Sequence, residues 1–413
     1  MSTKSSLLKN IPSLSKLKQK SILEISGPDS TKFLKGLSCK DVDLLKGGYS
    51  GFLNASGRVL HTSFIFPTTK LMKNGKQEKS YLITHESSSS SDHPNPLEDF
   101  LVPFKLRAKV RIKDVTNEYD NYSCYATEDL YSKGKGKEPI RNWKFGSGGA
   151  AESQWSWLNN EPRNLELKDN EVGCWDLRAG WSKSGLGRQV LVPKGEKPSL
   201  ASSHDLVSTE DYHLRRMLLG VPDGPNEIIP GSALPLESCM DLHGGVDFRK
   251  GCYLGQELTV RTYHTGATRK RILSIRLIPL NKGNTLLSEY LATPLDTASS
   301  TSGISNEQLE ITYIPSSTSA SKKSRSAGKI LSLHNNSSDV NSIGLGLIRI
   351  EFAERSCWSS SSPLMKEGLT IKDWYENDEI SKLTTKIGDQ IYGVYVDKGE
   401  AFSEALKVLE NKD

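Results

Sequence analysis

Residues 249–258, RKGCYLGQEL, contain the closest grouping of chemically reactive and charged side chains in this 413-residue chain. One thiol, that of Cys252, lies between Gly251 and Gly255, which permit unusual backbone angles and therefore predict a tight turn. The segment 255–261 predicts a short helix directly after that turn. A helix N-terminus and the two cations that precede the thiol would both favour its thiolate form.

Three roles are open for this cysteine on local grounds. A thiolate can attack an electrophile, or it can bind a soft metal such as iron. A packed cysteine in a glycine turn fits the local pattern equally well. The chain has no C-x-x-C pair, so Cys252 cannot hold a cluster alone, and any iron it binds needs ligands from a partner or cofactor.

Length and composition limit the class of protein. A chain of this length predicts two or three domains, and 36% hydrophobic with 25% charged residues is typical of a soluble globular protein. The net charge of +5 is mild, which argues against a dedicated nucleic-acid binder. No apolar run approaches the roughly 20 residues that cross a bilayer, so we expect no membrane partner. Scattered single cysteines indicate a reducing compartment.

The chain divides into three segments by pattern. Residues 1–20 are rich in Lys and Ser and poor in acids, which predicts either a mitochondrial targeting segment or a flexible, solvated N-terminus. Residues 21–267 alternate strand and helix signals and carry polar insertions near 70–96 and 132–149. Residues 268–413 contain short alternating strands between Ser, Gly and Asn stretches, which predict a small antiparallel β-barrel. The fold class is therefore α+β.

Several other sequence patterns give little information about function. The glycines of GSGG at 146 and GLGLIR at 344 lack the spacing of a dinucleotide fingerprint, and no P-loop, H-E-x-x-H or G-x-S-x-G motif occurs. Four cations follow the box: Arg261, Arg269, Lys270 and Arg271. They either line a site for an anion or form a solvated face, and a run of charges is more often a solvated face. Three upstream carboxylates could meet a pterin or lie on the surface; they are Glu237, Asp241 and Asp247.

The order of segments resembles the folate-binding YgfZ/GcvT-type family. RMLLGVPDG (216–224) and LPLE (234–237) precede VDFRKGCYLGQELTVRTYHTGATRKRI (246–272), which contains the family's K-G-C-[aromatic]-x-G-Q-E box. FLKGLSCKDV (33–42) and GFLNASGRVLHTSFIF (51–66) are similar to its opening elements. The chain looks most like a fungal member of the branch that assembles mitochondrial iron–sulfur clusters.

This resemblance implies a T-protein (aminomethyltransferase)-like tripartite fold with a folate-type cleft and a C-terminal antiparallel β-barrel. It implies a mitochondrial matrix protein that matures [4Fe-4S] proteins, such as aconitase-type enzymes and the radical SAM lipoate and biotin synthases. The implied partners are A-type iron–sulfur carrier proteins and tetrahydrofolate, with the protein a monomer when alone. The alternative is a tetrahydrofolate-dependent aminomethyl or one-carbon transferase, and whether the chain turns over any substrate stays open.

The resemblance also assigns residues. Cys252 falls on the functional thiol of the box, which implies a transient cluster ligand in a complex. Lys250, Gln256, Glu257 and Arg261 match positions that support this site or line the folate cleft. The chain departs from the family at Lys35-Gly36-Leu37-Ser38-Cys39, where a threonine is usual, and its leader contains no arginine.

Overall fold

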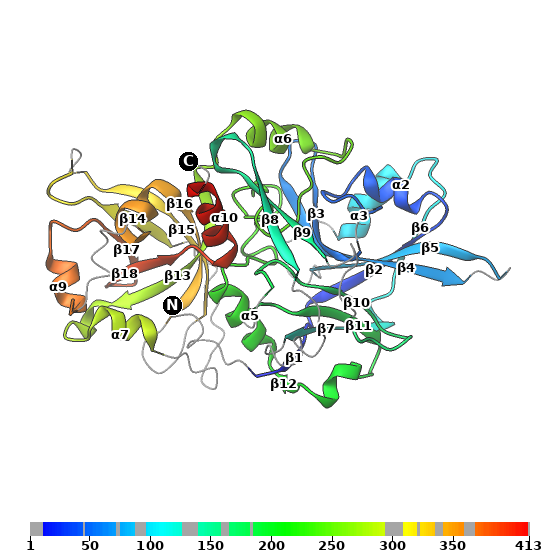
Figure 1. Ribbon diagram of the computed structural model, residues 1–413, viewed down its shortest axis with the longest axis horizontal. Helices are drawn as coiled ribbons and strands as arrows, with labels where there is room; N and C mark the ends of the chain where they lie inside the picture. Colours follow the sequence, from blue (N-terminus) through cyan, green and yellow to red (C-terminus); the bar gives the residue numbers. More distant parts are fainter. Residues whose placement is uncertain are drawn as a thin grey trace. The chain divides into compact units, whose positions relative to one another are not determined.

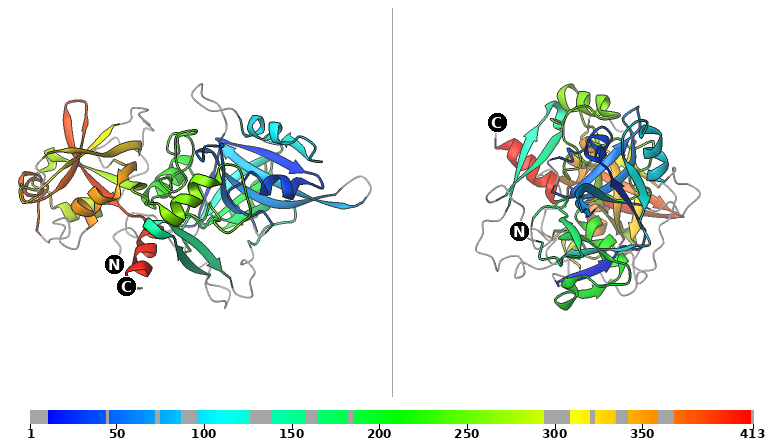
Figure 2. Two further views of the ribbon diagram at one scale, coloured as in Figure 1. Left: turned by 90° about the horizontal axis from the view of Figure 1, so that it is seen from above. Right: turned by 90° about the vertical axis from the view of Figure 1, so that its right-hand side faces the viewer.

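The computed structural model describes residues 11–43, 46–71, 75–86, 96–125, 139–157, 165–181, 185–293, 309–319, 323–334, 342–358 and 368–411. The first ten residues of the predicted targeting segment, and parts of both predicted insertions, lie outside these ranges. The chain folds into two compact units. The larger comprises described residues of 10–212, 223–268 and 401–413, and the smaller comprises those of 213–222 and 269–400 (Figures 1 and 2).

One sheet of the larger unit has the strand order β3-β4-β5-β2-β6. Its strands are β2 (Lys20–Ser26), β3 (Gly48–Leu53), β4 (Val59–Leu71), β5 (Gln77–Glu86) and β6 (Arg111–Asp114). A hairpin turn at Asn54–Gly57 joins β3 to β4, with Gly57 at φ 78°. Helices α2 (Ser30–Lys35) and α3 (Leu97–Leu101) contribute Leu34, Leu97 and Leu101 to the apolar cluster that also contains Ile25 and Phe52. This face of the sheet is therefore a hydrophobic core.

The second sheet of this unit has the order β10-β11-β7-β1-β12. Its strands are β1 (Ser13–Lys16), β7 (Tyr119–Tyr125), β10 (Val172–Trp175), β11 (Arg188–Pro193) and β12 (Asp205–Val207). Strand β1 pairs antiparallel with β7 and parallel with β12. The chain is thus part of the folded body from Ser13 onward, inside the segment predicted to be a targeting or flexible N-terminus.

Local signals account for the remaining elements of the larger unit. The hairpin β8 (Ile140–Phe145) and β9 (Ala151–Ser156) forms a separate two-stranded sheet, and α6 (Gln256–Thr265) begins where the box predicted a helix. Helix α5 (Thr209–Leu218) precedes VPDG, and Gly220 follows it at φ 71°. Asp29 is the N-cap residue of α2, but its side chain forms no capping hydrogen bond and instead accepts the Lys109 backbone N–H at 2.7 Å.

The smaller unit contains a closed barrel of order β13-β16-β15-β14-β17-β18, so the predicted C-terminal antiparallel barrel is confirmed. Its strands are β13 (Lys270–Pro279), β14 (Glu310–Ile314), β15 (Arg325–His334), β16 (Ile343–Arg349), β17 (Lys382–Ile387) and β18 (Gln390–Asp397). Three short helices accompany it: α7 (Leu287–Ala292), α8 (Ile350–Ala353) and α9 (Ile371–Glu376). GLGLIR is strand β16, where a Cβ on Gly344 would lie 2.0 Å from the Ser332 carbonyl oxygen.

Two further findings concern charge and boundaries. Arg271 on β13 is fully buried, so the solvated-face interpretation is wrong for this residue. Helix α10 (Glu400–Glu410) follows the barrel strands, yet residues from Ala401 onward group with the larger unit. The boundary between the predicted segments 21–267 and 268–413 therefore stays a prediction.

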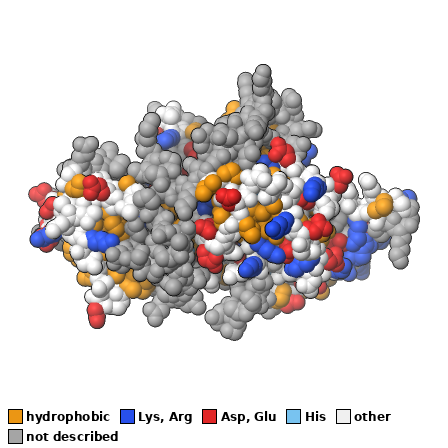
Figure 3. All heavy atoms as spheres, turned by 90° about the horizontal axis from the view of Figure 1, so that it is seen from below, with side chains coloured by type: hydrophobic (Ala, Val, Ile, Leu, Met, Phe, Trp, Pro, Cys, Tyr) orange, Lys and Arg blue, Asp and Glu red, His pale blue; other side chains and the backbone are white. Residues whose placement is uncertain are grey.

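Basic, acidic and apolar side chains are interspersed on the face in Figure 3. No helix of the described residues is long and apolar enough to span a bilayer.

Candidate functional site

Two motifs that are far apart in the sequence meet at the cysteine box. The Leu254 N–H donates to the Gly36 carbonyl at 3.0 Å, and the Asp247 N–H donates to the Cys39 carbonyl at 3.0 Å. These backbone bonds join the segment 35–40, which follows α2, to the box from both sides of the cysteine. The turn that carries Cys252 is therefore held at its two ends.

Lys250 completes this attachment. Its Nζ donates to the carbonyl oxygens of Lys35 at 2.7 Å, Ser38 at 2.6 Å and Lys40 at 3.2 Å, and lies 4.6 Å from the centre of the Tyr253 ring. An ammonium has three protons to donate, and these carbonyls use all of them. Burial lowers the pKa of Lys250 to about 8, although Cys39 and two carboxylates act in the opposite direction. Lys250 thus binds the chain's own backbone.

A third motif fixes the other side of the turn. Gly255 has φ 76°, and a Cβ at this position would lie 2.1 Å from the Asn54 carbonyl oxygen. A Cβ on Gly57 would in turn lie 2.9 Å from the Gly255 carbonyl oxygen. Both the left-handed backbone and the close approach require glycine at 255. The β3–β4 hairpin therefore packs directly against the start of α6.

The thiols of the chain fall into two classes. Cys252 is exposed, whereas the other cysteines are buried. Burial raises the pKa of Cys39 and that of Cys124 to about 12, and that of Cys357 to about 11. A buried thiol that resists ionisation is a poor nucleophile and a poor metal ligand. Cys252 is thus the accessible thiol, although no group of three or more His, Cys, Asp or Glu side chains in the described ranges is placed to hold a metal ion.

The remaining predicted box residues have different surroundings. The Gln256 Oε1 accepts the Tyr253 N–H at 3.3 Å, which closes the turn locally. Glu257 and Arg261 are exposed on α6, one helical turn apart, on the side of the helix away from buried Thr259 and Tyr263. Gln256 therefore has a structural contact, whereas Glu257 and Arg261 are available at the surface.

A carboxylate that sequence reasoning missed lies next to the box. Glu152 on β9 is buried, and its Oε2 has no hydrogen-bond partner among the described residues. Burial raises its pKa, whereas the hydrogen bond that Gln154 donates to its Oε1 at 3.2 Å lowers it; Asp247 raises the pKa further, against the cations Lys40 and Arg249. Burial, then Glu152, also raises the pKa of Tyr263. Nothing in the sequence around 152 distinguishes this glutamate from a surface residue.

The upstream carboxylates have separate positions. Asp241 is buried and its Oδ2 accepts the Ala151 N–H at 3.1 Å, whereas Asp247 is half-buried and its Oδ1 accepts the Arg249 N–H at 3.0 Å. Glu237 is half-buried. Arg269, Lys270 and Arg271 belong to the smaller unit. Asp241 and Asp247 therefore each accept a backbone N–H of the larger unit.

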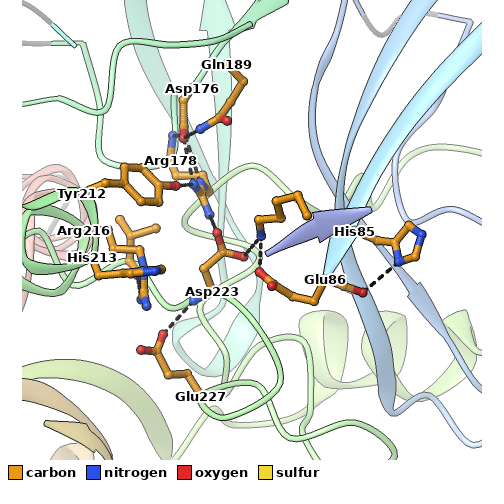
Figure 4. Close-up of polar contacts among 12 residues, drawn as sticks. His85, Glu86, Asp176, Arg178, Gln189, Tyr212, His213, Arg216, Asp223 and Glu227 are labelled. Carbon is orange, nitrogen blue, oxygen red and sulfur yellow. Dashed lines mark hydrogen bonds and ion pairs between the residues drawn. The ribbon is translucent and has the colours of Figure 1, made fainter. Parts of the chain in front are cut away.

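A dense buried ion-pair cluster occupies another part of the larger unit (Figure 4). The Arg178 guanidinium bonds both oxygens of Asp176, at 2.9 and 2.8 Å, together with the Tyr212 hydroxyl at 2.8 Å. It also pairs with Asp223 at 3.3 Å, and Asp223 in turn pairs with Lys20 at 3.2 Å. Lys20 additionally bonds Glu86, whereas Gln189 donates to Asp176 at 3.1 Å. Sequence reasoning missed this cluster because its members are distant in the chain.

Comparison with known proteins places the chain among named relatives. No family model matches it. It is 58% identical over 405 residues to the "Iron-sulfur cluster assembly factor IBA57 homolog, mitochondrial" of Cryptococcus neoformans, covering 97% of this chain and 99% of that protein. The protein of the same name from Neurospora crassa is 36% identical over 263 residues, covering 63% of this chain and 52% of that protein.

A solved structure supports the fold. The glycine cleavage system aminomethyltransferase T from Bartonella henselae aligns with a TM-score of 0.53 at 10% identity, covering 97% of this chain and 88% of that one. At this identity the likeness establishes the fold alone. The predicted T-protein-like fold class is confirmed.

Proposed function

Because this chain belongs to the IBA57 family of mitochondrial iron–sulfur cluster assembly factors, we propose that Cys252 is the thiol with which it binds cluster iron. The observation that carries this proposal is the contrast in exposure, since Cys252 is open to solvent and the other five cysteines are buried. The turn around it is anchored by Lys250 and by the backbone bond from Leu254 to Gly36. An anchored, accessible thiol can meet a ligand without refolding of the chain.

The proposed role is maturation of [4Fe-4S] proteins in the mitochondrial matrix, together with A-type carrier proteins. Recipients would be aconitase-type enzymes and radical SAM enzymes such as the lipoate and biotin synthases. On binding, the Cys252 thiol loses its proton to solvent and its sulfur forms a bond to iron. Since one cysteine cannot complete a cluster, the carrier would supply the other ligands in a shared complex.

The test is replacement of Cys252 by serine in cells that lack the native protein. Aconitase activity and lipoylation should fall while upstream [2Fe-2S] proteins stay normal, and the purified variant should keep its Tm because the side chain is exposed. Unchanged aconitase activity and lipoylation would refute the proposed role of the thiol.

Cys39→Ser is the matched control, because this thiol lies in the adjoining motif but is fully buried. A serine hydroxyl is smaller and more polar than the thiol it replaces, so burying it there should lower stability by about 1–3 kcal/mol. Loss of function by this route should appear together with a lower Tm, which separates a folding defect from loss of an iron ligand.

We propose Glu152 as a contact for tetrahydrofolate, the ligand that the family resemblance implies. A pterin presents an N–H edge and a flat face, and Glu152 offers a buried carboxylate oxygen without a partner among the described residues. Glu152 raises the pKa of Tyr263, and the centre of the Tyr263 ring lies 4.0 Å from that of Phe248, on which it stacks. Tetrahydrofolate should bind the wild type and bind Glu152→Gln about tenfold more weakly, because the amide replaces a charged acceptor. Equal affinities would remove Glu152 from the site.

One-carbon transfer is the second candidate function, and the shared fold is the observation in its favour. It predicts tetrahydrofolate-dependent turnover of an aminomethyl donor by the purified chain. Absence of turnover with tetrahydrofolate bound would exclude it and leave the assembly role unaffected.

A further inference from the structure

The segment Val102–Arg107, VPFKLR, exposes apolar and basic side chains in alternation. It follows α3 and begins with the 3-10 turn Val102–Phe104. The side chain of Leu106 is 89% exposed, that of Val102 is 49% exposed and that of Phe104 is 39% exposed. Lys105 and Arg107, on either side of Leu106, are exposed as well. We call this segment the VPFKLR loop.

The loop has a defined conformation. The Lys105 N–H donates to the Val102 carbonyl at 3.1 Å, and the Ala108 N–H donates to the Lys105 carbonyl at 2.7 Å. The Phe104 ring lies 5.3 Å from that of Phe100, which packs against the hydrophobic core of the first sheet. The loop therefore presents its side chains from a fixed base.

Leu106 is held in a backbone conformation that leucine avoids. Its φ is 39°, in the left-handed region that Gly and Asn occupy far more readily. A leucine that is strained and almost fully exposed contributes nothing to the core of its own chain. Such positions persist at binding sites, where the strained conformation serves a contact.

The loop itself contains two cations and no acid, and Glu98 and Asp99 of α3 precede it. Residues 100–113 contain five cations and no acid. Arg111 and Lys113 form ion pairs with Glu78 and Glu118. For Lys105 and Arg107, no ion pair with a carboxylate occurs within the part of the chain that is described. The two cations next to Leu106 are thus available to an acidic surface.

We propose that the VPFKLR loop is a docking surface for a protein with an apolar pocket surrounded by carboxylates. A rigid, preformed loop favours a protein partner, because a shaped pocket gains affinity from a fixed conformation whereas a fluid bilayer does not. Leu106 would fill the pocket as the anchor, and Lys105 and Arg107 would meet the acidic rim.

The loop belongs to the same compact unit as the thiol. Leu254, two residues beyond Cys252, packs against the same hydrophobic cluster as Phe100 and Ala108. A partner held by the loop therefore binds the unit that carries the proposed iron ligand. The inference rests on the proposed function in this respect: the docked protein is the carrier that shares a cluster with Cys252.

The experiment measures the Kd of the full chain for a purified A-type carrier protein by titration calorimetry. Leu106→Asn removes the apolar anchor but suits the left-handed backbone, so it should weaken binding about tenfold or more while Tm stays equal or rises. The double variant Lys105→Glu/Arg107→Glu should also weaken binding and reduce its dependence on salt. Leu71→Asn is the control, because Leu71 is 72% exposed on β4 outside the loop, and its Kd should match the wild type.

Each other outcome has a definite meaning. If the wild type binds the carrier and Leu106→Asn binds equally well, the docking surface is refuted and the assembly role stands. If the wild type does not bind the carrier, the proposed function fails and the docking proposal fails with it. If Leu106→Asn abolishes binding to anionic lipid vesicles but not to the carrier, the loop contacts membrane and the protein-docking proposal is overturned.

Discussion

Two lysines of the larger unit lie in opposite electrostatic surroundings. Lys20 belongs to the buried ion-pair cluster, where Asp223 and Glu86 outweigh the cost of burial and raise its pKa. Lys250 meets the backbone carbonyls of the segment 35–40 instead, and burial lowers its pKa to about 8. The first amine is neutralised by carboxylates, whereas the second relies on carbonyl dipoles.

This difference gives the two lysines different expected effects on the molecule. The ion-pair cluster joins strands, a helix and a loop of one unit through groups that compensate each other's charge. The Lys250 attachment joins two motifs around the accessible thiol, and its charge is only partly compensated. We expect the cluster to dominate the free energy of unfolding, and the Lys250 attachment to control the geometry and pH response of the cysteine turn.

The largest effect is expected at the centre of the ion-pair cluster. Arg178→Met should lower the free energy of unfolding by about 3–5 kcal/mol, because Asp176 and Asp223 would stay buried without their partner. Urea denaturation at pH 7 measures it. Lys113→Met is the control, since Lys113 pairs with Glu118 at the exposed surface and should leave the free energy of unfolding nearly unchanged. Similar losses in both variants would contradict the comparison.

Two glycines of the box provide the next test. Gly255→Ala should destabilise the chain by about 2–4 kcal/mol, because the added Cβ meets the Asn54 carbonyl at 2.1 Å and φ is 76°. Gly251→Ala should change stability by less than about 0.5 kcal/mol, since its Cβ would meet nothing within 4 Å. Thermal unfolding of the pair measures both. Equal Tm values would show that the turn is not tightly packed at 255.

The sequence predicted local elements well for a physical reason. Glycine and proline positions mark turns, and alternation marks strands, so the hairpin at Asn54–Gly57, helix α5 and the barrel were all predictable. These signals act over a few residues. The strand pairing of Ser13–Lys16 was not predictable, because it depends on β7 and β12, which lie more than a hundred residues away.

The site was predictable in part. The glycines and the thiol of the box pointed to an anchored cysteine turn, and Cys252 is exposed. The partners of Lys250 were not predictable, because backbone carbonyls carry no side-chain signal at residues 35–40. Glu152 and Arg178 were missed for a related reason: burial, which gives each its significance, is a property of the fold.

Loss of the Lys250 attachment should have a moderate effect. Lys250→Met leaves three carbonyl oxygens without their donor and should cost about 1–3 kcal/mol. It should also change the rate at which iodoacetamide alkylates Cys252, because the turn loses an anchor. Lys35→Met is the control, since its amine pairs with Asp41 and Asp43 at the surface and its loss should leave the free energy of unfolding nearly unchanged. An unchanged alkylation rate would limit Lys250 to a role in stability.

A further difference is expected in the pH dependence of the two lysines. Since the pKa of Lys250 is about 8 in the folded chain and 10.5 otherwise, the unfolded chain binds more protons between these values. Its contribution to stability should therefore be constant below pH 8 and rise up to pH 10.5, by at most about 1.4 kcal/mol per pH unit. For Lys20 the pKa is raised, so its contribution should be constant up to pH 10.5 and fall only above it. The measurement is the free energy of unfolding of the wild type, Lys250→Met and Lys20→Met between pH 6 and 10. The difference between the wild type and each variant gives the contribution of that lysine at each pH. Parallel pH profiles for the two lysines would contradict the opposite surroundings that distinguish them.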